Sequence, residues 1–151
     1  MTELSVSFKD NDGGVEISKQ GNVIIASLIG SCGDDVIDFF ITHMQRIAQC
    51  YENQPWAYLC NSADFQATTP SGERKLIANY RFCMNAGCVY DAYCYISPVG
   101  IAQTEKVMRA NGNDKPISEI LFDDEEKAMD YLQQKLTKYK KRHANRFPDM
   151  E

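Results

Sequence analysis

The sequence predicts one α/β domain that is built on a mostly parallel sheet, with an N-terminal β-hairpin and about four helices. Its 151 residues, of which 44% are hydrophobic and 25% charged, are typical of a single globular domain. Strand-like and helix-like hydrophobic patterns alternate along the chain, which favours the α/β class. We therefore expect a domain over residues 15–140, a flexible N-terminal segment over residues 1–14, and a basic, flexible tail over residues 141–151.

The first elements should be a hairpin and a long helix. VEIS (15–18) and NVIIASLIG (22–30) are separated by only three residues, which suits a short turn. Asp34 or Asp35 can then cap a helix. The apolar side chains after this cap recur every three or four residues, which is the period of one buried helical face: Ile37, Phe40, Ile41, Met44, Ile47, Ala48 and Tyr51.

A buried strand and a second helix should follow. WAYLCNS (56–62) is short, aromatic and apolar, as is typical of a strand that is buried on both faces of a parallel sheet. We expect a loop over residues 63–69. Thr69 can cap the next helix, with Pro70 at its first position, and Gly87 is a natural end for it.

CVYDAYCYI (88–96) predicts another strand, in which an acidic residue lies among aromatic ones. Alternation places Asp91 on the same face as Tyr93. An acid on an apolar strand face can have a perturbed pKa and mark a functional site. The alternative is that Asp91 is solvated at a sheet edge or strand end. The sequence leaves both interpretations open.

The last part of the chain should hold a third helix, a final strand and a fourth helix. Ser97 followed by Pro98 repeats the cap-plus-proline start of a helix. ISEILF (117–122) predicts the strand. Asp123 with Glu126 three residues later forms a variant of the capping box, which predicts where the last helix begins.

Charge is distributed unevenly along the chain. The net charge is −5, but residues 1–134 carry 10 basic against 19 acidic side chains, and residues 135–151 carry 6 against 2. This acidic balance argues against a nucleic-acid partner, and no apolar run is long enough to predict a membrane span. The basic end is either a solvated helix terminus or a patch for an acidic partner or anionic surface. Five of its six cations extend the predicted C-terminal helix: Lys138, Lys140, Lys141, Arg142 and Arg146.

The N-terminus lacks a basic segment followed by an apolar one, so we expect no secretory signal and a cytoplasmic protein. Six cysteines are then expected to be free thiols. They contain no CxxC pair, and with only two histidines the sequence predicts no metal site. Cys32 precedes a predicted helix N-terminus, where a thiolate is stabilised, and is therefore the best candidate for a reactive thiol.

The common catalytic signatures are absent. The sequence has no GxGxxG, GxxxxGK[ST], HExxH or GxSxG pattern, so it predicts no phosphate, dinucleotide, zinc or serine-hydrolase site. The acidic run over residues 123–126 is explained by capping and by the helix dipole. We therefore expect a non-enzymatic protein without a cofactor.

The order of elements, together with three phrases, resembles the SpoIIAA-like branch of the STAS superfamily of sulfate transporters and anti-sigma-factor antagonists. The phrases are NVIIASLIG, PWAYLCNSADF and the final LFDDEEKAMDYL, and the resemblance covers about residues 15–136. It implies a STAS-like fold and a regulatory or protein-interaction role in a bacterial-type cytosolic protein.

The resemblance also bears on phosphorylation. Phosphorylatable STAS antagonists carry their switch serine in an Asp-Ser-Ser-Gly turn before the second helix. Aligning Ser71 and Gly72 with the last Ser-Gly of that turn places Pro70 at the modified position, and proline cannot accept phosphate. Thr69 is the remaining candidate acceptor, and its simpler role is that of a helix cap.

Three functions follow as hypotheses. The leading one is an interaction module that binds a protein partner or a second copy of itself. Its surface would comprise Asn61, Ser62, Asp64, Thr68, Thr69 and Ser71. The second is binding of a small hydrophobic, lipid-like ligand between sheet and helices, in a pocket formed by Trp56, Phe82, Tyr90, Tyr93 and Tyr95. The third is thiol redox chemistry at Cys32.

Overall fold

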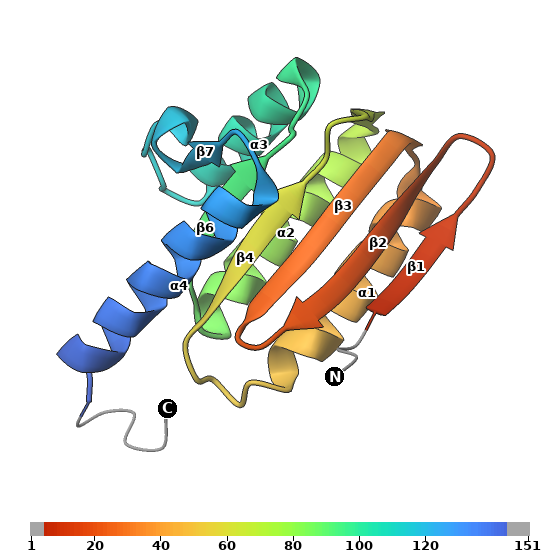
Figure 1. Ribbon diagram of the computed structural model, residues 1–151. Helices are drawn as coiled ribbons and strands as arrows, with labels where there is room; N and C mark the ends of the chain where they lie inside the picture. Colours follow the sequence, from red (N-terminus) through yellow and green to blue (C-terminus); the bar gives the residue numbers. More distant parts are fainter. Residues whose placement is uncertain (1–4, 145–151) are drawn as a thin grey trace.

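A computed structural model describes residues 5–144, which form one sheet covered by helices (Figure 1). Strands β2 (Gly13–Gln20) and β3 (Val23–Cys32) form the expected antiparallel hairpin. Strands β4 (Trp56–Asn61) and β6 (Cys88–Cys94) extend the sheet in parallel from β3. The α/β class, the hairpin and the mostly parallel sheet are therefore confirmed.

Four helices cover the sheet unevenly. Helices α1 (Asp34–Gln49), α2 (Pro70–Asn85) and α3 (Pro98–Ala110) lie on one side of the sheet, and α4 (Glu125–Arg142) lies on the other, over β4 and β6 (Figure 1). Since α4 covers this part of its side and the start of β3, no described helix covers the same face of β2 and of the rest of β3.

Apolar residues form the core on both sides of the sheet. On the first side, α1 packs its predicted stripe, which includes Ile37, Phe40 and Met44, against β2 and β3. On the second side, Leu132 and Leu136 of α4 pack against the central strands. The sheet is thus buried on both faces at β4 and β6, as the apolar sequence of β4 predicts.

The N-terminal segment differs from its prediction. Residues 5–9, expected to be flexible, form strand β1 (Ser5–Lys9), which pairs antiparallel with β2. Val6 and Phe8 pack against the α1 side of the core, and Phe8 stacks on Phe39 with ring centroids 5.4 Å apart. Strand β1 is thus stabilised by contacts with α1, which comes later in the chain. The short sequence of β1 does not reveal these contacts.

Two further strand predictions were wrong in detail. Residues 65–68, expected to be a loop, form β5 (Phe65–Thr68), which pairs in parallel with the end of β3. Residues 117–122 form a 3-10 helix (Ile117–Ile120) and only a two-residue strand, β7 (Leu121–Phe122). The 3-10 turn places Ile117 and Ile120 on one side, where both are buried.

Helix starts were predicted well where proline follows the cap. Thr69 and Ser97 cap α2 and α3 through their hydroxyl groups, as expected. Helix α1 instead begins after Gly33, which makes no side-chain cap, and Asp124 rather than Asp123 caps α4. The expected tail also differs, since α4 continues to Arg142; residues 145–151, including Arg146, lie outside the described residues.

Candidate functional site

The segment between β4 and α2 begins with two residues that serve the fold. Ser62 is only 2% exposed, and its Oγ accepts a hydrogen bond of 2.9 Å from the backbone N–H of Leu28 in β3. Asn61 donates from Nδ2 to Oε1 of Glu125 at the start of α4, at 3.0 Å. Both side chains therefore tie β4 to its neighbours and contribute little to an outer surface.

The rest of the predicted interaction residues lie where β5 leads into α2. Asp64 and Thr69 are exposed, whereas Thr68 and Ser71 are partly buried. Between them, Gln66 and Ala67 of β5 are also exposed, although the sequence analysis did not single them out. We call this segment, residues 63–71 with the first turn of α2, the α2 surface.

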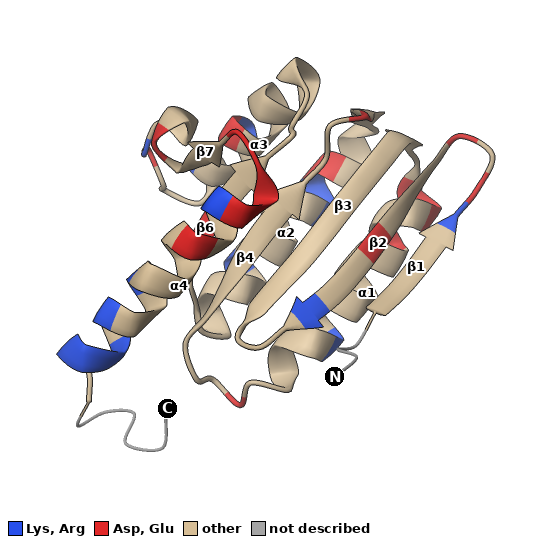
Figure 2. Ribbon diagram, viewed as in Figure 1, with Lys and Arg blue, Asp and Glu red and all other residues tan. Residues whose placement is uncertain are grey.

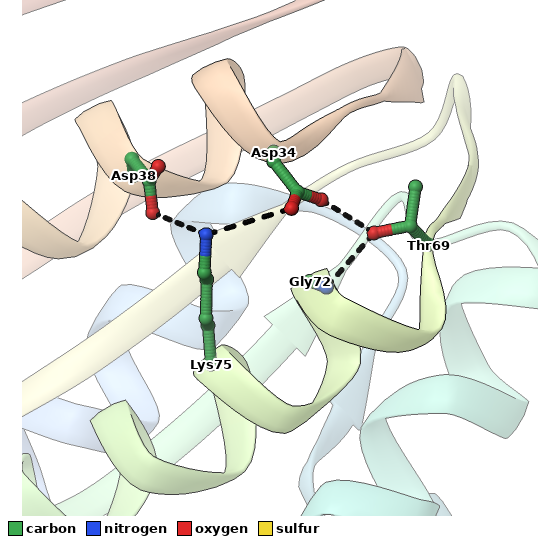
Figure 3. A network of polar contacts seen from close by, with 5 residues as sticks. All are labelled: Asp34, Asp38, Thr69, Gly72 and Lys75. Carbon is green, nitrogen blue, oxygen red and sulfur yellow. Dashed lines mark hydrogen bonds and ion pairs between the residues drawn. The ribbon is translucent and has the colours of Figure 1, made fainter.

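Polar contacts around Thr69 join the starts of α1 and α2 (Figure 3). Its Oγ1 accepts a hydrogen bond from the backbone N–H of Gly72 at 2.9 Å and donates to Oδ1 of Asp34 at 2.6 Å. Lys75 then bridges two aspartates of α1, with Nζ 3.6 Å from Oδ2 of Asp34 and 2.8 Å from Oδ1 of Asp38. These contacts hold the α2 surface in one arrangement.

The same contacts keep the carboxyl group of Asp34 ionised. Hydrogen bonds from Thr69 and Ser71 lower its pKa, and the nearby Lys75 ammonium adds to this effect. The Asp38 carboxylate in turn raises the pKa of Lys75. Because the pKa of Asp34 lies below its ordinary value, the contacts persist above that value and are lost only as the pH falls through the lowered pKa.

Close packing explains the glycine after Ser71. A Cβ atom at Gly72 would collide with Oγ1 of Thr68 and would lie 3.3 Å from Cγ1 of Ile37 in α1. The absence of a side chain therefore lets the first turn of α2 approach both β5 and α1. Gly72 thus has a structural reason here that is independent of any modification.

Thr69→Ala removes the hydroxyl group and is expected to lower the free energy of unfolding by about 1 kcal/mol, because the N-cap hydrogen bond from Gly72 is lost. Thr69→Ser should retain most of the stability. Ser97→Ala is the matched control, since Ser97 caps α3 in the same way. Urea unfolding measures the stabilities. Only Thr69→Ala should also raise the pKa of Asp34 in carboxyl NMR, and an unchanged stability and pKa would contradict the described contacts.

A cavity of about 330 Å³ lies between the sheet and helices α1, α2 and α3. Of the five predicted pocket residues, Tyr90 and Tyr93 line it, whereas Trp56, Phe82 and Tyr95 lie outside it. Trp56 is fully buried, and Tyr95 follows β6 with a positive φ of 50° and a 47% exposed side chain. Two of the five residues therefore border this cavity, and ligand binding there stays a prediction.

Asp91 and the tyrosines around it form the polar part of the cavity. The hydroxyl of Tyr93 donates to Oδ2 of Asp91 at 2.9 Å, and that of Tyr80 donates to the same oxygen at 3.4 Å. Asn113 donates to Oη of Tyr80 at 3.0 Å. Burial raises the pKa of Asp91, which the tyrosine hydrogen bonds and Lys115 partly offset. Asp91 is therefore partly buried and hydrogen-bonded, and a functional role for it stays a prediction.

The six thiols are all free. Cys32 is the last residue of β3, is 1% exposed, and lies near the carbonyl oxygens of Gly14 and Ile29. Burial raises its pKa to about 11, so its thiol stays protonated at neutral pH. These observations do not favour the reactive-thiol hypothesis.

Charge is polarised along α4 (Figure 2). Acidic side chains occupy its first turn, and Lys140, Lys141 and Arg142 occupy its last. Arg142 also makes a structural contact, since it donates to Oη of Tyr90 at 2.9 Å. The arrangement matches the helix dipole at both ends.

Within residues 5–144, no three His, Cys, Asp or Glu side chains gather so as to hold a metal ion. No helix in this part of the chain is long and apolar enough to span a membrane.

No protein-family model and no curated protein matches this sequence. Among solved structures, the unphosphorylated form of the anti-sigma factor antagonist SpoIIAA superposes with a TM-score of 0.56 at 13% identity, over 80% of this chain and 96% of that one. SLC26A9 superposes with a TM-score of 0.53 at 9% identity, over 82% of this chain but 21% of that one. The chain therefore has a STAS/SpoIIAA-like fold, as the resemblance implied.

Proposed function

We propose that this chain is a non-enzymatic, STAS-like regulatory module that binds a protein partner through the α2 surface. The similarity of its fold to an anti-sigma factor antagonist supports an interaction role. The observation on which the proposal rests is the arrangement in Figure 3, in which Thr69, Asp34 and Lys75 fix the start of α2 against α1. The proposal places the module in the cytoplasm.

The α2 surface suits recognition because it is exposed and firmly supported. Asp64, Gln66, Ala67 and Thr69 present their side chains to solvent. The backbone beneath them is held by pairing of β5 with β3 and by the cap of α2. A site on such a fixed scaffold loses little conformational entropy when a partner binds.

Phosphorylation at Thr69 would remodel this surface. Its hydroxyl oxygen lies 2.6 Å from the Asp34 carboxylate, so a phosphoryl group there would break the contact and place like charges together. The helix N-terminus favours the added charge, but Asp34 opposes it. Thr69 would thus alter the junction between α1 and α2 if modified, whereas Pro70 offers no acceptor.

The α2 surface is tested by adding bulk without removing any hydrogen bond. Ala67 is exposed in β5, and Ala67→Arg should abolish partner capture in a pull-down from cells that make the protein. Ala78→Arg is the matched control, because Ala78 is an exposed alanine of α2 that lies outside the α2 surface. It should capture the partner as the wild type does. Light scattering of the purified protein identifies the case in which the partner is a second copy.

Equal capture by both variants would contradict this choice of surface. A wild-type chain that stays monomeric and captures no protein under the same conditions would contradict the interaction function itself. The third hypothesis, redox chemistry at Cys32, gains no support from a thiol that is 1% exposed.

A further inference from the structure

We propose that the cavity between the sheet and helices α1 to α3 binds a small, mostly apolar molecule of about two rings that carries an amine. Asp91, at the polar part of the cavity, would receive the amine. This inference does not depend on the protein-interaction function, since Phe65 of β5 is the one residue of the α2 surface that also lines the cavity.

The size and walls of the cavity define the body of the ligand. A volume of about 330 Å³ lies within the usual range of ligand sites. It is about twice that of a cavity of roughly 150 Å³ that holds one benzene ring. Most side chains around it are apolar or aromatic, which favours a flat hydrocarbon body. They include Leu28, Phe40, Met44, Leu76, Val89 and Val107.

The charges around the cavity define the polar group. Asp91 is the only carboxylate among the described residues that line it, and Lys115 is the only lysine or arginine. Lys115 is exposed, and no described lysine or arginine makes an ion pair with Asp91. Asp91 is partly buried, and a carboxylate in such a place that lacks an ion-pair partner is costly, so an ammonium group that enters the cavity would compensate it.

A second acceptor points to the same kind of ligand. Gln103 of α3 also lines the cavity, and its Oε1 is buried without a hydrogen-bond partner among the described residues. The Nε2 of the same amide donates to Glu73, at 3.4 Å. An unsatisfied carbonyl oxygen and a carboxylate both call for N–H donors, whereas an acidic ligand would meet the like charge of Asp91.

Three probes of similar size separate the contributions of body and amine. Tryptamine carries the amine, indole-3-acetate carries an acid, and indole is neutral. Calorimetry at pH 7 should show that tryptamine binds about 10- to 100-fold more tightly than either of the others. This ratio corresponds to the usual free energy of a hydrogen bond to a charged group. Asp91→Asn should remove this preference and leave the weak binding of indole unchanged.

Two further variants show whether the probe enters the cavity. Thr104 lines the cavity on α3, and Thr104→Phe should fill part of it and weaken tryptamine binding by at least tenfold. Ala102 is exposed on the same helix and does not line the cavity, so Ala102→Phe should bind tryptamine normally. The proposal is overturned if tryptamine and indole-3-acetate bind equally, if Thr104→Phe has no effect, or if no probe binds at millimolar concentration.

Discussion

Replacing Trp56 with alanine is expected to lower the free energy of unfolding by about 3–5 kcal/mol, the range for deleting a buried aromatic side chain. Trp56 opens β4, is fully buried, and stacks on Tyr51 with ring centroids 5.6 Å apart. Its Nε1 donates to the backbone oxygen of Ala86 at 3.0 Å. The truncation therefore leaves both a void and an unsatisfied carbonyl.

Trp56→Phe separates these two losses, since it keeps an aromatic ring but removes the hydrogen bond to Ala86. We expect a smaller loss of about 1–3 kcal/mol in urea unfolding. A loss below about 1 kcal/mol for Trp56→Ala would contradict its place in the core. It would favour instead the sequence-based assignment of this tryptophan to a ligand pocket.

Replacing Asp91 with asparagine is expected to stabilise the protein at pH 7, because it removes the charge of a partly buried carboxylate that has no ion-pair partner among the described residues. Burial raises the pKa of Asp91, which means that the folded protein holds the ionised form at a cost. Asparagine keeps an oxygen that accepts from Tyr93 and Tyr80, and it removes the buried charge. A residue that reduces stability while it lines a cavity is typical of a functional site.

The pH dependence of this gain has a definite sign. Below the ordinary pKa of 3.8, Asp91 is neutral in both folded and unfolded chains, so wild type and Asp91→Asn should be equally affected by pH. As the pH rises through the raised pKa, the wild type loses stability relative to the variant. Urea unfolding between pH 4 and pH 8 measures the difference.

Other groups near Asp91 do not obscure this comparison. The hydroxyl groups of Tyr80 and Tyr93 face Asp91. Their pKa values are raised above the ordinary value of 10.0, and so is the pKa of Tyr131 on α4. The neighbouring thiols of Cys60 and Cys88 likewise have raised pKa values, and Lys115 is the one cation of the described residues that lowers the pKa of Asp91. A variant that is less stable than wild type across this pH range would show that Asp91 is a stabilising residue.

The sequence predicted elements whose signals are local. Thr69 with Pro70 and Ser97 with Pro98 mark helix starts through contacts within one turn, and the α1 stripe repeats over several turns. Strands β1 and β5 were missed because each is held in place by hydrogen bonds to a strand elsewhere in the chain, β1 to β2 and β5 to β3. A short polar strand is recognised only once the neighbouring strand is placed.

The site was predictable only in part, for the same reason. Asp91 and Tyr93 are two residues apart in one strand, so alternation placed them on one face. Tyr80, Asn113 and Lys115 come to Asp91 from α2 and from the segment after α3, and no pattern in the sequence joins them. Composition likewise cannot show which way Trp56 or Tyr95 points.

The most direct test of the proposed function is an amide NMR map of this chain with its captured partner. We predict that shift changes concentrate in residues 63–75, which include the α2 surface, and that Ala67→Arg abolishes them. The alternative surface is the face of β2 and β3 that no described helix covers (Figure 1). Shift changes confined to that face, with residues 63–75 unaffected, would contradict the account.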